Sequence, residues 1–234
     1  MAARSIIFDT GPIISLALND LLWILEPLKK NFGGGFYLPG SVKKELVDRP
    51  IEIKRFKFEA LRVLSYINNG VLQVIGDQKM TEKTRYLMET ANMIFSAKGN
   101  FIQIVHYGEM ESLAAAMIMQ SSAMVIDERT TRMLIENPKR LRDIMEHKLH
   151  VKLQMDKEML ERFMKEVKGI KLIRSTELAV AAYDLGLLDR FIPQMENAKS
   201  QLLDGVLWGI KLNGCSISER EIETIIKVET KGKN

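Results

Sequence analysis

The sequence of 234 residues contains a single cysteine, Cys215, so no disulfide can form within the chain. That is the usual situation in a reducing compartment. The sequence also lacks any uncharged stretch close to the ~20 residues that a membrane-spanning helix requires. Residues Met1–Arg4 lead into no long apolar region with a small-residue cleavage site, so no secretory signal is predicted. We therefore expect a cytoplasmic protein with no membrane partner.

Common nucleotide-binding and nucleophile signatures are missing as well. Neither a Gly-x-x-x-x-Gly-Lys loop nor a Gly-x-Gly-x-x-Gly turn occurs in the sequence, so nucleotide binding loses its usual support. Thr10 and Ser15 have no convincing base nearby in sequence, and nucleophilic catalysis is not predicted. His147 and His150 lie in a highly charged segment without obvious further metal ligands, and we interpret them as surface residues.

Charge is only mildly unbalanced, with 34 Lys and Arg against 30 Asp and Glu, a net charge of +4 and a pI near 9.0. The whole excess of +4 falls between residues 129 and 152. Seven basic residues in this segment face three acidic ones: Arg129, Arg132, Lys139, Arg140, Arg142, Lys148 and Lys152 against Glu136, Asp143 and Glu146. Two interpretations stay open, a solvated helix face and a face that contacts phosphates.

Short apolar runs, rich in β-branched or aromatic residues and bounded by Gly, Pro or Asp, predict buried strands. Five such runs occur: Ser5–Phe8, Phe36–Leu38, Val71–Ile75, Ala123–Ile126 and Ile170–Ile173. Continuous apolar strands separated by helical stretches favour a parallel sheet covered on both faces. We therefore predict an α/β protein with three α/β/α layers around a central parallel sheet, plus added helices.

Capping residues predict where several helices begin and end. Ser41 is expected to cap a helix that starts at Val42, and Thr81 to open an amphipathic helix that stops at Gly99. Glu109 is expected to open an alanine-rich helix after Gly108. Near the C-terminus, a helix over 201–212 should end at Asn213-Gly214, and Ser218-Glu-Arg-Glu221 fits a capping box before the last helix.

A highly charged stretch, residues 137–168, reads as a helical insertion in one domain that spans residues 1–234. It is too polar to form an independent core, yet apolar residues recur in it at largely helical intervals. Such an arm must bury its apolar stripe against the rest of the chain or against a second copy, and a self-associating arm is the arrangement we favour.

Four carboxylates occupy positions that core packing does not require. Asp9 and Asp127 each follow a predicted strand, and the carboxyl edge of an open parallel sheet is where ligands bind. Glu109 lies at a helix start, where a carboxylate is stabilised, and Glu45 borders the buried side of its helix. Carboxylates gathered in this way repel each other unless a cation is present. Hard oxygen ligands suit Mg²⁺ or Mn²⁺.

Ordered motifs in the sequence resemble those of the PIN-domain family. The apolar strand that runs into Asp9-Thr-Gly-Pro resembles the family's opening motif, and Pro39 through Val42-Lys-Lys-Glu45-Leu resembles the second. Gly108-Glu109-Met-Glu111 resembles the Gly-Glu-x-Glu helix start of the VapC-like ribonuclease branch. Val125-Ile-Asp127-Glu-Arg129 with Arg132 resembles the strand end of that branch, and residues 178–226 resemble its tail.

The resemblance implies a single PIN-like domain, a Rossmann-like sheet and an acidic metal site. The family's four acids fall on Asp9, Glu45, Glu109 and Asp127. Asp9, Glu109 and Asp127 are expected to bind the metal, and Glu45 to bind it through water or orient the attacking water. Glu111 competes for the third place, but the separation of Glu109 from Asp127, 18 residues, fits the family better than 16.

The predicted function is metal-dependent endonucleolytic cleavage of RNA, with Thr10, Arg129 and Arg132 as substrate-binding residues. The metal would polarise the phosphate and supply hydroxide. One alternative is a non-catalytic module of the same fold that binds RNA or protein. A phospho-receiver with Asp77 as acceptor is a weaker alternative, since receivers carry paired acids after the first strand. Two protein partners are also conceivable, a second copy of the chain and an antitoxin-like protein.

Overall fold

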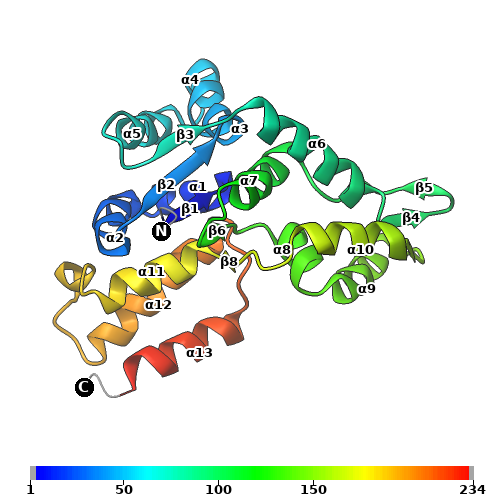
Figure 1. Ribbon diagram of the computed structural model, residues 1–234. Coiled ribbons are helices and arrows are strands. Elements are labelled where there is room, and N and C mark those ends of the chain that lie inside the picture. Colours follow the sequence, from blue (N-terminus) through cyan, green and yellow to red (C-terminus); the bar gives the residue numbers. More distant parts are fainter. Residues whose placement is uncertain (1–3, 232–234) are drawn as a thin grey trace.

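A parallel sheet of five strands forms the centre of the molecule in the computed structural model, which describes residues 4–231. The strand order is β3-β2-β1-β6-β8, and every neighbouring pair is parallel (Figure 1). The strands are β1 (Ser5–Phe8), β2 (Gly35–Pro39), β3 (Gln73–Ile75), β6 (Ala123–Val125) and β8 (Leu172–Ile173). All five predicted strands are therefore confirmed, with small differences at their ends.

Helices cover both faces of this sheet because successive side chains of its strands point to opposite faces. In β1, Ile6 and Phe8 enter one hydrophobic cluster and Ile7 enters the other. The first cluster is covered by α1 (Thr10–Leu18), α2 (Leu25–Phe32), α5 (Lys57–Asn68), α11 (Ser175–Asp184), α12 (Ala198–Leu212) and α13 (Glu219–Thr230). The second is covered by α6 (Gln78–Asn92), α7 (Tyr107–Ile118), α8 (Arg129–Glu136), α9 (Pro138–Leu149) and α10 (Lys157–Glu166). The predicted three-layer α/β/α fold is confirmed.

Shorter helical segments complete the chain. They are η1 (Leu22–Ile24), α3 (Gly40–Lys43), the π-helical turn η2 (Lys44–Asp48), α4 (Arg49–Ile53) and η3 (Asp189–Phe191). The predicted cap at Ser41 is wrong, because α3 already begins at Gly40 after the extended residue Pro39. Ser41 therefore lies inside the helix, where its backbone N–H and its hydroxyl both donate to Glu111 Oε2.

The predicted helix from Thr81 to Gly99 is wrong at both ends. The side chain of Asp77 accepts a hydrogen bond from the backbone N–H of Met80 at 2.7 Å, so α6 begins earlier, at Gln78. The helix ends at Asn92, whose side chain accepts from the backbone N–H groups of Ile104 and Val105. The chain after Asn92 forms a hairpin, with Gly99 in its turn at φ +82°. No Gly or Pro between residues 92 and 99 announces this change in the sequence.

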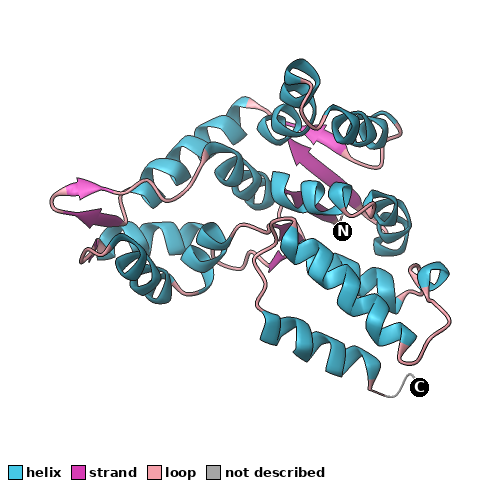
Figure 2. Ribbon diagram, turned by 180° about the vertical axis from the view of Figure 1, so that it is seen from behind, coloured by secondary structure: helices cyan, strands magenta, loops and turns pink. Residues whose placement is uncertain are grey.

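A second, antiparallel sheet was not predicted. It contains β4 (Phe95–Ala97), β5 (Asn100–Phe101) and β7 (Gln154–Met155), in the order β5-β4-β7. Together with α9, α10 and the distal end of α6, these strands form an arm that extends away from the main sheet (Figures 1 and 2). The stretch over 137–168 is accordingly two helices joined through β7, and not one continuous helix.

The arm buries its apolar side against α6 of the same chain. Phe163 in α10 is fully buried and Val167 nearly so, in the cluster that also contains Leu87 and Ala91 of α6. An ion pair between Lys83 and Glu166 joins the same two helices. Of the two arrangements considered for the apolar stripe, burial against the rest of the chain and burial against a second copy, these contacts correspond to the first.

The C-terminal helices α11, α12 and α13 lie side by side along one edge of the molecule (Figures 1 and 2). The capping box at Ser218 is confirmed, since its hydroxyl and the Glu221 side chain exchange hydrogen bonds with each other's backbone. Gly214 follows α12 at φ +115°, as expected for a helix stop. Within residues 4–231, no single helix is long and apolar enough to span a membrane. The helix α1 and the helical segment Leu22–Phe32 reach that length and apolar character only together, and they are bent by 117° relative to each other.

Candidate active site

An open pocket of about 390 Å³ lies at the carboxyl edge of the main sheet, where β1 and its neighbour β6 end. All four predicted acids line it, although they are far apart in the sequence. The lining residues are Asp9, Thr10, Gly11, Glu45, His106, Gly108, Glu109, Asp127, Glu128 and Gly214. Because strands β1 and β6 are parallel neighbours, the residues that follow them meet at this edge.

Asp9 is almost fully buried at the pocket, with 5% of the residue exposed. Its pKa is raised to about 7, chiefly by burial and also by the negative charges of Glu109 and Glu45, while hydrogen bonds from the backbone N–H groups of Thr10 and Gly11 oppose the rise. A carboxylate in this state gains strongly from a cation that replaces the proton.

Glu109 occupies the third position of α7, because the helix begins at Tyr107, two residues before the start predicted from the sequence. Its Oε2 accepts hydrogen bonds from the backbone N–H of His106 at 3.1 Å and from the Thr131 hydroxyl at 2.7 Å. Burial raises its pKa, and the two hydrogen bonds act in the opposite direction. The carboxylate of Glu128 adds to the rise. Glu109 is thus held by two donors and faces a fifth acid.

Glu45 projects into the pocket from the π-helical turn η2, a type of turn that occurs often at functional sites. The Thr10 hydroxyl donates to Glu45 Oε2 at 2.8 Å, which ties the turn to the residue after Asp9. Gly108 lies beside this carboxylate, since a Cβ at that position would be in van der Waals contact with Glu45 Oε1 at 3.5 Å. The side chain itself remains exposed to solvent.

Asp127 differs from the other three acids because both of its oxygens are already bonded to protein groups. Oδ1 accepts from the Ser175 backbone N–H at 2.8 Å, and Oδ2 accepts from the hydroxyls of Ser15 and Ser175 at 2.8 and 2.6 Å. The residue is 2% exposed. It therefore braces the end of β6 against α1 and α11 while it lines the floor of the pocket.

The remaining sequence candidates lie in other surroundings. Glu111 is not among the lining residues and instead accepts the two hydrogen bonds from Ser41. Arg129 is exposed, whereas Arg132 is mostly buried and donates to the Ser216 carbonyl at 3.2 Å. Neither arginine lines the pocket, so Thr10 alone of the three expected substrate-binding residues does.

Residues that sequence reasoning missed also line the site. Glu128 directly follows Asp127 and caps α8 by accepting from the Thr131 backbone N–H at 2.7 Å. Its adjacency to a candidate acid was the available signal. His106 precedes α7, and Gly214 enters the pocket from the turn after α12. Gly214 carries no local signal, since only the packing of the C-terminal helices brings it there.

The carboxylates are hard oxygen donors of the kind that Mg²⁺ and Mn²⁺ prefer. Across the part of the chain that the structure describes, no three Asp, Glu, His or Cys side chains are close enough together to hold a metal ion as they stand. Asp9 nevertheless fits a cation, because it is buried and repelled by Glu45 and Glu109. Its raised pKa shows that nearby positive charge is lacking to balance its negative charge.

Comparison with known proteins agrees with this geometry. A family model described as PIN domain matches residues 5–139, more than half of the chain, and this range includes all four acids. No curated protein matches the chain, and no solved structure does. The fold is generally that of a nuclease, and its members typically use divalent metals such as Mg²⁺ or Mn²⁺. On the strength of the match and the architecture, the chain belongs to the PIN-domain family.

Proposed function

We propose that the chain is a divalent-metal-dependent endoribonuclease of the VapC-like branch. The observation that carries this proposal is the meeting of Asp9, Glu45 and Glu109 around one pocket, with the pKa of Asp9 raised to about 7. Structural carboxylates are normally paired with cations or left in water. A partly dehydrated group of acids in an open pocket supports binding of a hard cation and of a phosphate bridged by it.

Asp9 and Glu109 are the residues best placed to hold Mg²⁺ or Mn²⁺ directly, with Glu45 in contact through water. The bound ion would lower the pKa of a water molecule and neutralise charge on the phosphate. Thr10 orients Glu45 through its hydroxyl, and Thr131 orients Glu109 in the same way. Asp127 is the third metal ligand that the family motif assigns. Here it keeps the edge of β6 in place through Ser15 and Ser175.

RNA is the proposed substrate, and a pocket that is open to solvent leaves room for the phosphate backbone of a strand to reach the acids. A second copy of the chain and an antitoxin-like protein stay as proposed partners. The Gly108-Glu109-Met-Glu111 motif that suggested this branch serves two purposes in the fold. Glu109 faces the pocket, and Glu111 anchors α3 through Ser41.

The proposal is tested by hydrolysis of an unstructured RNA in Mn²⁺ by the wild type and by Asp9→Asn. The amide keeps the shape of the side chain but removes a charge that the metal requires, so we expect at least a hundredfold loss of cleavage. Glu223→Gln, on the exposed side of α13, is the matched control and should retain full activity. Undiminished cleavage by Asp9→Asn would place the activity elsewhere.

One observation favours a second function, a non-catalytic module that binds RNA or protein. The hydrogen bonds to both oxygens of Asp127 reduce the number of acids free for a metal. In that case the wild type binds RNA in the same assay but leaves it intact at every Mn²⁺ concentration. Titration of Mn²⁺ into the protein, followed by calorimetry, separates the two functions further. A nuclease should show a Mn²⁺-binding site that is lost in Asp9→Asn, whereas the inactive module should show no such site.

A further inference from the structure

A second, apolar groove adjoins the carboxylate pocket. It has a volume of about 120 Å³ and is bounded by α1, η2, α4 and α5. Glu45 lines both the groove and the carboxylate pocket, so the two are neighbours that meet at this residue. Three exposed apolar side chains line the groove, those of Ile14, Leu18 and Phe56. Three more are exposed on the adjoining helices α4 and α5: Ile53, Phe58 and Leu61. Exposed apolar side chains gathered in this way mark a binding surface.

Two aromatic rings stand out on this surface. The side chains of Phe56 and Phe58 are 49% and 70% exposed, and Phe56 lines the groove. The guanidinium of Arg55 lies 5.0 Å from the centre of the Phe56 ring, and that of Arg62 lies 6.0 Å from the centre of the Phe58 ring. Arg62 is itself fixed by Asp20 and by the carbonyl of Ala17. The rings are therefore accompanied by positive charge.

The backbone between α4 and α5 places Phe56 outside both helices, and Phe58 follows in the first turn of α5. Lys54 and Phe56 adopt left-handed conformations at φ +65° and +58°, which are uncommon for residues other than glycine and rare for a bulky aromatic side chain. They interrupt the helical path, so residues 52–58 are all exposed in sequence. A buried role for either ring is excluded by this exposure.

The same short segment carries a concentrated positive charge. Lys54, Arg55 and Lys57 lie within four residues, and no acid occurs between Ile53 and Phe58. None of the ion pairs found among residues 4–231 involves these three cations. Three exposed cations without acidic partners complement a polyanion. An apolar peptide would cover the rings but leave this charge unmatched.

We propose that the 53–58 segment and the groove beside it bind unpaired bases of a single-stranded RNA whose backbone continues into the carboxylate pocket. Bases would stack on Phe56 and Phe58, and the three cations would contact phosphates, which is how single strands are commonly bound without sequence preference. Ile14 and Leu18, one helical turn apart on α1, line the groove and add exposed apolar surface to it. This inference rests on the proposed function, because it names how that site holds its substrate.

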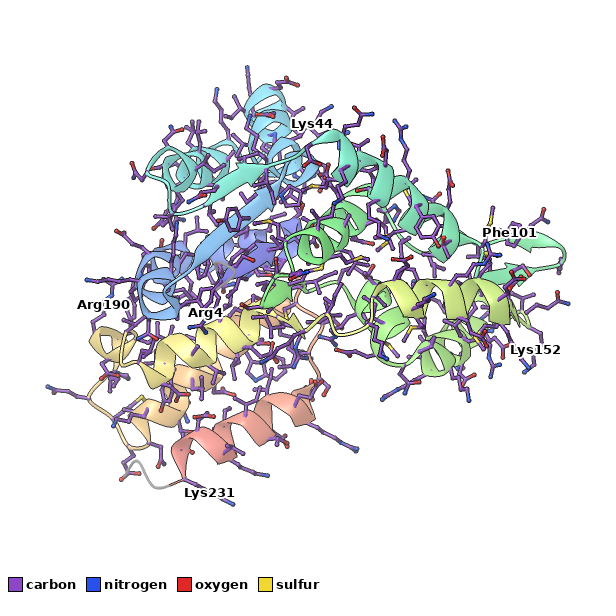
Figure 3. All side chains as sticks on the ribbon, in the orientation of Figure 1. Arg4, Lys44, Phe101, Lys152, Arg190 and Lys231 are labelled. Atoms are coloured by element: carbon purple, nitrogen blue, oxygen red, sulfur yellow. The ribbon has the colours of Figure 1, made fainter. Side chains whose placement is uncertain are left out.

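Binding in EDTA tests the inference without any cleavage. The probe is a fluorescein-labelled 12-nucleotide single-stranded RNA, and the readout is anisotropy with the full-length protein. We expect the double variant Phe56→Leu with Phe58→Leu to bind at least tenfold more weakly, because leucine keeps apolar area but has no ring for stacking. Phe101→Leu is the matched control, since Phe101 is equally exposed but lies at the tip of the arm (Figure 3). Its affinity should equal that of the wild type.

Two further probes separate the contributions of bases and phosphates. An oligomer of the same length without bases should bind the wild type and the double leucine variant equally. Replacing Lys54, Arg55 and Lys57 by glutamine should flatten the dependence of log affinity on log salt by about 2, since each phosphate contact on a single strand contributes about 0.7. Equal binding of the ordinary RNA by the wild type and the leucine variant overturns the inference. The inference is also overturned if light scattering shows that the wild type is a dimer and the leucine variant a monomer, because the surface is then an interface between copies.

The failure of this inference can be told apart from failure of the proposed nuclease function. If the wild type cleaves RNA in Mn²⁺ and the leucine variant cleaves it with unchanged kcat and KM, the proposed RNA-binding role of Phe56 and Phe58 is wrong and the nuclease function stands. If the wild type binds RNA through the two rings but never cleaves it, the RNA-binding role stands and the nuclease function is wrong. If both proposals are right, the leucine variant should cleave RNA with a raised KM and little change in kcat.

Discussion

At Asp9, burial and the neighbouring carboxylates act in the same direction, and both favour the protonated side chain. In the unfolded chain an aspartate titrates near its usual pKa of about 4. In the folded protein without metal, the pKa of Asp9 is about 7. Between these two values the folded state binds the proton more tightly than the unfolded state does, so the free energy of unfolding must fall as the pH rises.

We therefore expect the metal-free wild type to lose stability from pH 4 to pH 7, by up to about 1.4 kcal/mol per pH unit, and to level off above pH 7. Asp9→Asn should abolish this decline and should be more stable than the wild type at pH 8. Urea unfolding in a chelator at several pH values measures both effects. Parallel stability curves for the two proteins would contradict the raised pKa.

Asp127 illustrates a different use of a buried carboxylate, because its oxygens hold segments of the chain together. Removing the hydroxyl of Ser175 leaves the buried Asp127 Oδ2 with one donor fewer, which costs about 1–3 kcal/mol for a charged acceptor. Ser175→Ala should lower the free energy of unfolding by this amount. Ser65→Ala, at an exposed position of α5, is the control and should change it by less than about 0.5 kcal/mol. A Ser175→Ala variant as stable as this control would show that the brace is absent.

At the scale of the elements, the first turn of α6 depends on Asp77 and not on Thr81. The Asp77 side chain accepts from the backbone N–H of Met80, whereas the Thr81 hydroxyl only donates back to the Asp77 carbonyl from inside the helix. Asp77→Ala should therefore cost about 1 kcal/mol of stability, as the loss of a helix N-cap commonly does. Thr81→Ala should be nearly neutral in the same thermal or urea unfolding experiment. If Thr81→Ala instead lost more stability than Asp77→Ala, the start of the helix predicted at Thr81 from the sequence would be correct.

The sequence predicted those elements whose local signals agree with the packing. The five strands of the main sheet were readable because each is a short apolar run bounded by turn residues, and two of them end in acids. The antiparallel sheet of the arm was not readable, since β4, β5 and β7 are two or three residues long and no Gly or Pro separates α6 from β4. Short strands of this kind gain their partners only through tertiary contacts.

The candidate site was predictable to a similar extent. Asp9 and Asp127 follow strands, and that position is visible in the sequence. Ser41 misled the prediction because its hydroxyl meets Glu111, 70 residues away, and such a partner is invisible to local reasoning. The hydrogen bonds from Ser15 and Ser175 to Asp127 span 112 and 48 residues, so the bracing role of that acid was equally hidden.

At the scale of the whole molecule, α6 reaches from the main body into the arm, and the arm is held together by the contact between α6 and α10. Phe163 is fully buried in that contact. Phe163→Ala should lower the free energy of unfolding by about 3–5 kcal/mol, because it removes a large buried side chain and leaves a cavity. Leu149→Ala, at an exposed position of α9, should have little effect.

Light scattering on the same two variants addresses the self-association that the sequence favoured. If the arm's apolar stripe serves only the contact with α6, the molar mass of the Leu149→Ala variant equals that of the wild type. A wild-type dimer that Leu149→Ala converts to a monomer would instead show that the outer side of α9 contacts a second copy, and would support the self-associating arm.

The part of the chain that matches the family model ends at residue 139, but the hydrophobic cluster around Phe8 does not end there. That cluster also contains Leu178, Ala182, Leu203, Leu207 and Ile222, and β8 completes the sheet beside β6. A fragment cut at the boundary of the family match would expose this apolar face to water and would lose the outer neighbour of β6. The boundary of sequence similarity is therefore a poor guide for expressing a shortened protein, because residues beyond the match complete the core on which the matched motifs rest.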